Sequence, residues 1–218
     1  MRERQTDFNK NVFFNCPFDT DYNRLFYAVV FTIHFAGFKA RCSKELNDGS
    51  DRMHKIVGLI GNCKYGIHDI SRVQPRFNMP FELGLDIGFK EGGNRKYKKK
   101  SHLILATHQH RYKKYLSDLA GRDAAAHKDR IADIILAVRD WLNDAEEVKK
   151  RHPLPSGALI YEAYRKFRRR LPELCKESDL SMKHLTFSDY SYIVAKFIQL
   201  TARKEAETKR LRNRRKHR

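Results

Sequence analysis

The segment 65-YGIHDISRVQPRFNMPFELGLDIG-88 decides the fold of this chain. A short apolar run ends on Asp69, a polar loop follows, and an apolar helical pattern begins near Pro80 with Glu82 in its opening. This order predicts a strand-to-helix crossover, and ligands of open α/β sheets bind beside such crossovers at the carboxyl ends of the strands. The neighbours of Glu82 have the pattern of core residues, and a carboxylate in apolar surroundings is costly unless it is used.

Short apolar runs alternate with helical patterns on both sides of this segment. Strands are expected at 11–14, 39–43, 65–70 and 102–107, and helices at 20–36, 53–60 and 80–89. Strands and helices that alternate in this way predict an α/β fold with a parallel sheet covered on both faces. We expect a flavodoxin-like doubly wound sheet of order 2-1-3-4, or an extension of that order.

The pattern changes after about residue 110. Apolar stripes at helical spacing follow at 131–142, 160–171 and 190–198, and these are typical of helix packing faces. The sequence therefore predicts an α/β domain at 1–110, a helical cap packed on it at 111–200, and a disordered basic tail at 201–218.

Composition points to a cytoplasmic protein with reduced thiols. Four cysteines lack CxxC spacing, the first ten residues are polar and charged, and no apolar run approaches the length of a membrane span. A formal net charge of +19 indicates a polyanionic partner or an anionic substrate. Much of this excess lies in Arg95–Lys100 and Arg203–Arg218, which predict either nucleic-acid contacts or a solvated loop and tail.

The predicted sheet order brings several polar residues to one crevice. Strands one and three would be adjacent, so Asn15, Asp69 and Glu82 would converge at their carboxyl ends. Convergent carboxylates beside a sugar suit chemistry at an anomeric carbon, where a cationic centre develops. The alternative for Glu82 is a carboxylate that caps its own helix. Four residues of the intervening loop are predicted to bind substrate, with the two arginines as phosphate clamps: Ser71, Arg72, Arg76 and Asn78.

The motifs NVFFNCPF and FELGLDIG resemble the nucleoside 2-deoxyribosyltransferase-like group and its superfamily with Toll/interleukin-1 receptor (TIR) domains. The resemblance implies that Glu82 is the nucleophilic or charge-stabilising carboxylate and that Asp69 handles the base or its leaving proton. It also implies that Phe14, Asn15 and Pro17 line the base and sugar pocket. The segment between Asp69 and Glu82 is longer and more basic than in a small transferase, which leaves the substrate open.

Two functions are compatible with these residues. The first is an N-glycosidase or nucleoside-transferring enzyme that cleaves the ribose–base bond of NAD or a nucleotide, and the resemblance suggests antiviral defence as its setting. The second is a non-catalytic nucleotide-sensing or nucleic-acid-tethered module. The carboxylate pair favours the enzyme, with NAD or nucleotide as substrate and with neither cofactor nor metal. A homo-oligomer and a partner in a defence complex both stay open.

Other candidate groups have plainer interpretations. His102, His108 and His110 lack a Cys or carboxylate partner at ligand spacing, so a surface cluster is expected rather than a metal site. Cys16 has no histidine beside it in sequence and is expected to be a small buried thiol.

Overall fold

The computed structural model describes residues 7–45, 51–72, 77–109 and 123–216, with side chains to residue 213. It divides into two compact units, with the boundary between Glu162 and Ala163. The boundary expected near residue 110 is therefore displaced. The structure places a further strand and a further sheet-covering helix after that point, and both belong to the first unit.

The first unit is built on a five-stranded sheet in which all strand pairs are parallel. Its order is β2-β1-β3-β4-β5, which confirms the predicted fold class and the extended form of the predicted order. The strands are β1 (Asn11–Asn15), β2 (Lys39–Arg41), β3 (Tyr65–Asp69), β4 (Ser101–Ala106) and β5 (Ala125–Ala126). Every residue of β1 and β3 is buried, as expected for central strands covered on both faces.

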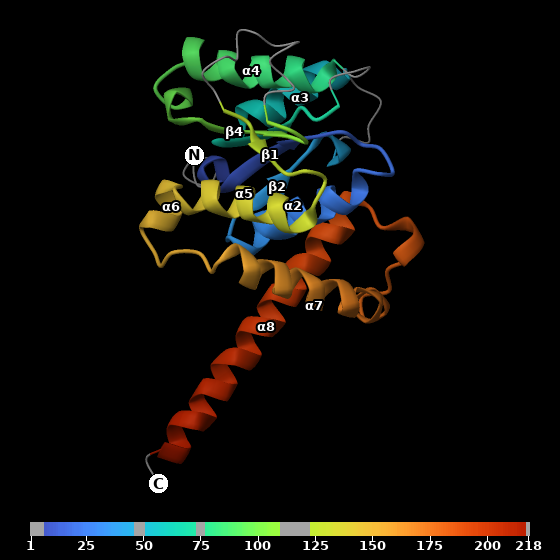
Figure 1. The fold of residues 1–218 in the computed structure, drawn as a ribbon, viewed down its shortest axis with the longest axis vertical. Helices are drawn as coiled ribbons and strands as arrows, with labels where there is room; N and C mark the ends of the chain where they lie inside the picture. Colours follow the sequence, from blue (N-terminus) through green and yellow to red (C-terminus); the bar gives the residue numbers. More distant parts are fainter. Residues whose placement is uncertain (1–6, 46–50, 73–76, 110–122, 217–218) are drawn as a thin grey trace. The chain divides into compact units, whose positions relative to one another are not determined.

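Helices cover both faces of this sheet (Figure 1). One pair is α2 (Asn23–Phe35) with α5 (Ile131–Asn143), and the other is α3 (Arg52–Gly61) with α4 (Asn78–Gly92). Shorter helices are η1 (Ser43–Glu45), η2 (Tyr97–Lys99) and α6 (Glu146–Lys149). The strand order reverses direction between β1 and β3, so the crevice outside their carboxyl ends is the expected ligand site.

The second unit contains most of one helix and the whole of another. Helix α7 (Gly157–Lys176) begins in the first unit, and η5 (Met182–His184) and α8 (Phe187–Lys216) follow. The rings of Tyr190 and Phe197 on α8 pack edge-on against Phe167 on α7. The basic tail expected to be disordered is instead helical as far as Lys216, because it continues α8 without a break.

Among the described residues, no helix has both the length and the apolar character that a bilayer crossing requires.

Candidate functional site

Glu82 lies in the second turn of α4, and 9% of its surface is exposed. Burial raises the pKa of its carboxyl to about 7, although the charge of Arg52 opposes this. No acidic residue lies in the first turn of α4, so Glu82 is not placed as a cap of its own helix. Its carboxyl makes no hydrogen bond with any residue that the structure describes. A nearly buried carboxyl left in this state is a candidate for function.

The thiol of Cys16, one residue after β1, lies under the influence of both predicted carboxylates. Cys16 is fully buried, and burial is the main reason that its pKa is raised well above the usual range. Cys42, Asp69 and Glu82 raise this pKa further, while Lys44 opposes them. The thiol therefore stays protonated and unreactive, as the sequence predicted. Asp69 and Glu82 therefore both act electrostatically on the Cys16 thiol at the carboxyl end of β1.

Asp69, the last residue of β3, is buried and satisfied on both oxygens. Its Oδ1 accepts the Ser71 N–H at 2.9 Å. Its Oδ2 accepts the Tyr22 hydroxyl at 2.5 Å and lies 3.1 Å from His127 Nε2. Burial alone would raise the pKa of Asp69, but His127, Ser71 and Tyr22 outweigh it and hold the pKa below its ordinary value. Asp69 is therefore a fixed anion.

His127 follows β5 and was not recognised from the sequence. Its Nδ1 accepts the N–H of Asp129 at 3.1 Å, so the ring proton lies on Nε2, which faces Asp69 and the Ser71 hydroxyl at 2.8 Å. Lys128 and Asp129 both have positive φ, a costly conformation for residues other than glycine. In a serine hydrolase triad the carboxylate contacts the other ring nitrogen, so this cluster is not arranged to activate Ser71.

Asn15 connects the end of β1 to α4 and to a second buried cluster. Its side-chain amide donates to the Met79 carbonyl at 2.9 Å and lies 3.2 Å from His68 Nδ1. The other nitrogen of His68 lies 2.9 Å from Asp86 on α4. Asn15 thus holds the first turn of the helix that carries Glu82.

Asp86 has two further partners that sequence reasoning assigned to the surface. Lys100 Nζ lies 2.9 Å from its Oδ1 and donates to the carbonyls of Ile60 and Cys63. His102 Nε2 lies 3.3 Å from the same oxygen. Burial would raise the pKa of Asp86, but these histidines and Lys100 lower it strongly. The side chains of Lys100 and His102 are buried, so neither belongs to an exposed basic run or histidine cluster.

The remaining predicted binding residues are placed as follows. Phe14 is buried and stacked on Phe26 with ring centroids 5.7 Å apart, and Pro17 is also buried. Arg72 is paired with Asp19 at 3.2 Å. Asn78 is exposed at the start of α4. Arg76 and His110 lie outside the described residues, and His108 is exposed.

Two cations at this edge were missed. Lys44, after β2, lies over the rings of Phe18 and Phe26, and its charge lowers the pKa of Cys16. Arg52, the first residue of α3, is exposed, and its charge lowers the pKa of Glu82. Both follow the strand next to β1, and their position after that strand was the only signal in the sequence.

Within the described ranges, no cluster of three or more His, Cys, Asp or Glu side chains is arranged to hold a metal ion. Comparison of the chain with protein-family models, with curated proteins and with solved structures found no match.

Proposed function

We propose that this protein cleaves the N-glycosidic bond between ribose and base, with NAD as the preferred substrate over a free nucleotide. The observation that supports this proposal is Glu82. Its nearly buried carboxyl has a pKa raised to about 7 and follows β3 at the point where the strand order reverses. An anion at the carboxyl edge of a doubly wound sheet is suited to a ribose whose anomeric carbon becomes cationic.

In the proposed reaction the bond between C1′ and the base nitrogen breaks, and its electron pair leaves with the base. Ionised Glu82 stabilises the cationic C1′, or captures it in a C1′–O ester bond that water later breaks. In either case the water oxygen bonds to C1′ and one proton of the water is released to solvent. A carboxyl with a pKa about 7 is part ionised at neutral pH, and a nearby cation favours the ionised form further. The cationic nicotinamide ribose of NAD would therefore ionise Glu82 on binding.

The state of Asp69 supports NAD over a neutral nucleoside. A neutral purine or pyrimidine leaves more easily when an acid protonates it, whereas nicotinamide leaves NAD as a neutral molecule without a proton. Asp69 is a poor acid because its pKa is lowered and both oxygens already accept hydrogen bonds. We assign Asp69 a positioning role: with Tyr22 and His127 it joins α2, β3 and the loop after β5 around the site.

Lys44 and Arg52 supply positive charge at the same edge, which suits a pyrophosphate. Arg72 contributes to phosphate binding only if it exchanges its ion pair with Asp19 for the substrate. The pyrophosphate is thus a second reason that the proposal prefers NAD to an uncharged nucleoside.

The test is release of free base by the purified full chain. NAD, ATP and an unphosphorylated nucleoside are incubated separately, and products are separated by chromatography. We expect nicotinamide from NAD and a loss of roughly 100-fold or more with Glu82→Gln. Glu91→Gln is the matched control, since it makes the same change at an exposed position on α4.

Three results would contradict the proposal. Absence of base release from all three substrates would rule out the proposed enzymatic activity. Tight NAD binding without turnover would instead favour a nucleotide-sensing module. Full activity in Glu82→Gln would support the enzymatic activity but show that Glu82 has no role in its mechanism.

A further inference from the structure

Positive charge is concentrated in the second unit. From residue 163 onward the chain has 17 Lys and Arg residues against 6 Asp and Glu, a formal excess of 11 out of the total of 19. This part of the chain is only 56 residues long. The charge density there is far above that of the unit with the candidate site.

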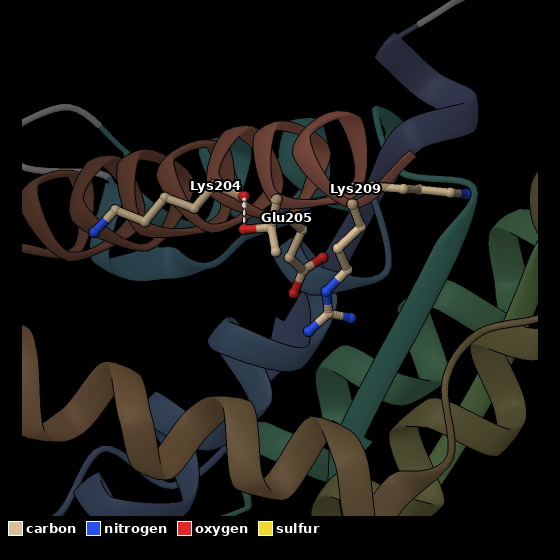
Figure 2. A pocket seen from close by; sticks show the side chains of 5 residues that line it. Lys204, Glu205 and Lys209 are labelled. Carbon is tan, nitrogen blue, oxygen red and sulfur yellow. Dashed lines mark hydrogen bonds between the residues drawn. The ribbon is translucent and has the colours of Figure 1, made fainter. Parts of the chain in front are cut away.

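The charge continues along the second half of α8, where the described side chains are exposed. The first half of α8 is held by buried apolar side chains such as Ile193, Val194 and Phe197. From Ala202 to Asn213 every described side chain is exposed. Within this stretch the Thr208 hydroxyl donates to the Lys204 carbonyl at 2.8 Å, a contact internal to the helix (Figure 2). A helix that is polar on all sides is not held by a core, and its exposed side chains can contact a binding partner.

The basic side chains of this stretch surround the helix instead of forming one stripe. At 3.6 residues per turn, five described cations point to all sides of the axis: Arg203, Lys204, Lys209, Arg210 and Arg212. Glu205 and Glu207 lie among them, which leaves a net excess of three positive charges. Figure 2 shows Lys204 and Lys209 extending from α8 in different directions. A flat anionic surface would use one face of such a helix. A groove with phosphates on both walls would engage cations on two opposite sides of the helix as well as on the side that enters the groove.

We propose that residues 202–213 of α8 are a docking helix for the major groove of double-stranded DNA, bound mainly through phosphates. The groove is about 12 Å wide, which matches the diameter of an α-helix with its side chains. The major groove of an RNA duplex is too deep and narrow to admit one. An anionic membrane fits less well because this stretch has no apolar face, and its only large apolar side chain is the exposed Leu211.

The basic segment Arg95–Lys100 is the competing surface. Lys100 is buried beside Asp86 and is not exposed with the rest of this segment. The Lys98 ammonium donates to the Glu91 carbonyl. Lys96 lies over the ring of Phe8 at 4.4 Å. Fewer free cations are therefore presented by this segment than its sequence suggests.

The experiment measures binding of the full chain to a labelled DNA duplex of about 20 base pairs by fluorescence anisotropy over a range of salt concentrations. The variant combines Lys204→Gln, Lys209→Gln and Arg212→Gln, which keep good helix formers in place. The matched control removes the same number of exposed charges through Arg95→Gln, Lys98→Gln and Lys99→Gln.

We expect the α8 variant to lose at least about tenfold in affinity and to lower the salt slope by about 3, near 0.9 for each phosphate contact removed. The control variant should change the affinity and the salt slope by much less. The same affinity and slope in the α8 variant would overturn the proposal, and so would a larger effect of the control. Equal binding to an RNA duplex, or preference for anionic vesicles, would also overturn it. Base release plays no part in this assay, so the outcome is independent of Glu82.

Discussion

Replacement of Glu82 by Gln should change how the stability of the protein depends on pH. The pKa of Glu82 is about 7 in the folded chain against an ordinary value of 4.5. The folded state therefore keeps this proton at pH values where the unfolded state has released it. The stability that this group contributes is fully present below about pH 4.5 and declines as pH rises to about 7.

The size of the effect follows from the shift. At 1.36 kcal/mol per pKa unit, the change from 4.5 to about 7 corresponds to roughly 3 kcal/mol of unfolding free energy. Gln has nearly the same shape and carries no proton to lose, so the variant should not show this decline. Relative to the parent, Glu82→Gln should gain roughly 2 kcal/mol by pH 6 and roughly 3 kcal/mol by pH 8.

Urea denaturation of both proteins at several pH values between about 4.5 and 8 measures this difference. Other titrating groups, Asp69 and Asp86 among them, are common to both proteins and cancel in the comparison. Glu91→Gln again serves as the matched control at an exposed position of α4. A difference for Glu82→Gln that stays constant with pH would show that its carboxyl is ordinary, and the main support for the proposed site would be lost.

Three further changes test other parts of the structure. If ionised Glu82 is required, kcat/KM for base release should rise about tenfold per pH unit below about pH 7 and level off above it; a flat profile would contradict this. His127→Gln should cost about 1–3 kcal/mol in urea denaturation by removing a partner of buried Asp69, and an unchanged midpoint would show that the contact contributes nothing. Gly66→Ala should lower the melting temperature because its Cβ would overlap Asp86 and His68. Gly58→Ala has open space around it and should stabilise α3 by about 0.5–1 kcal/mol. Equal effects of the two substitutions would argue against crowding at Gly66.

The fold could be predicted because its signals are local. The apolar run that ends on Asp69 and the helical pattern around Glu82 are each legible within a few residues, and alternation of such units specifies a parallel sheet. The adjacency of β1 and β3 then places Cys16, Asp69 and Glu82 at one edge. β5 was missed because Ala125–Ala126 is too short and too plain to give a strand pattern.

The contacts of the site could not be predicted in the same way. Ser71 and His127 are 56 positions apart, and Lys100 stands in a run of cations that is typical of solvated loops. Only the fold shows that Lys100 turns inward to Asp86. One signal was available: a glycine inside a strand often marks a close approach, and the Asp86 carboxylate occupies the space that a side chain at Gly66 would need.

The two acidic residues that α4 buries, Glu82 and Asp86, are one turn apart and so lie on neighbouring parts of its surface. Asp86 lies beside Lys100 and two histidines, and these neighbours lower its pKa. Among the described residues, the charge of Arg52 lowers the pKa of Glu82, but this effect does not offset the effect of burial. The chain has 45 Lys and Arg residues against 26 Asp and Glu, so this contrast does not arise from a shortage of cations. Asp86 therefore has the surroundings of a structural carboxylate, whereas the described neighbours of Glu82 do not offset its burial. This contrast is why the proposed reaction assigns the stabilisation of a ribosyl cation to Glu82 rather than to Asp86.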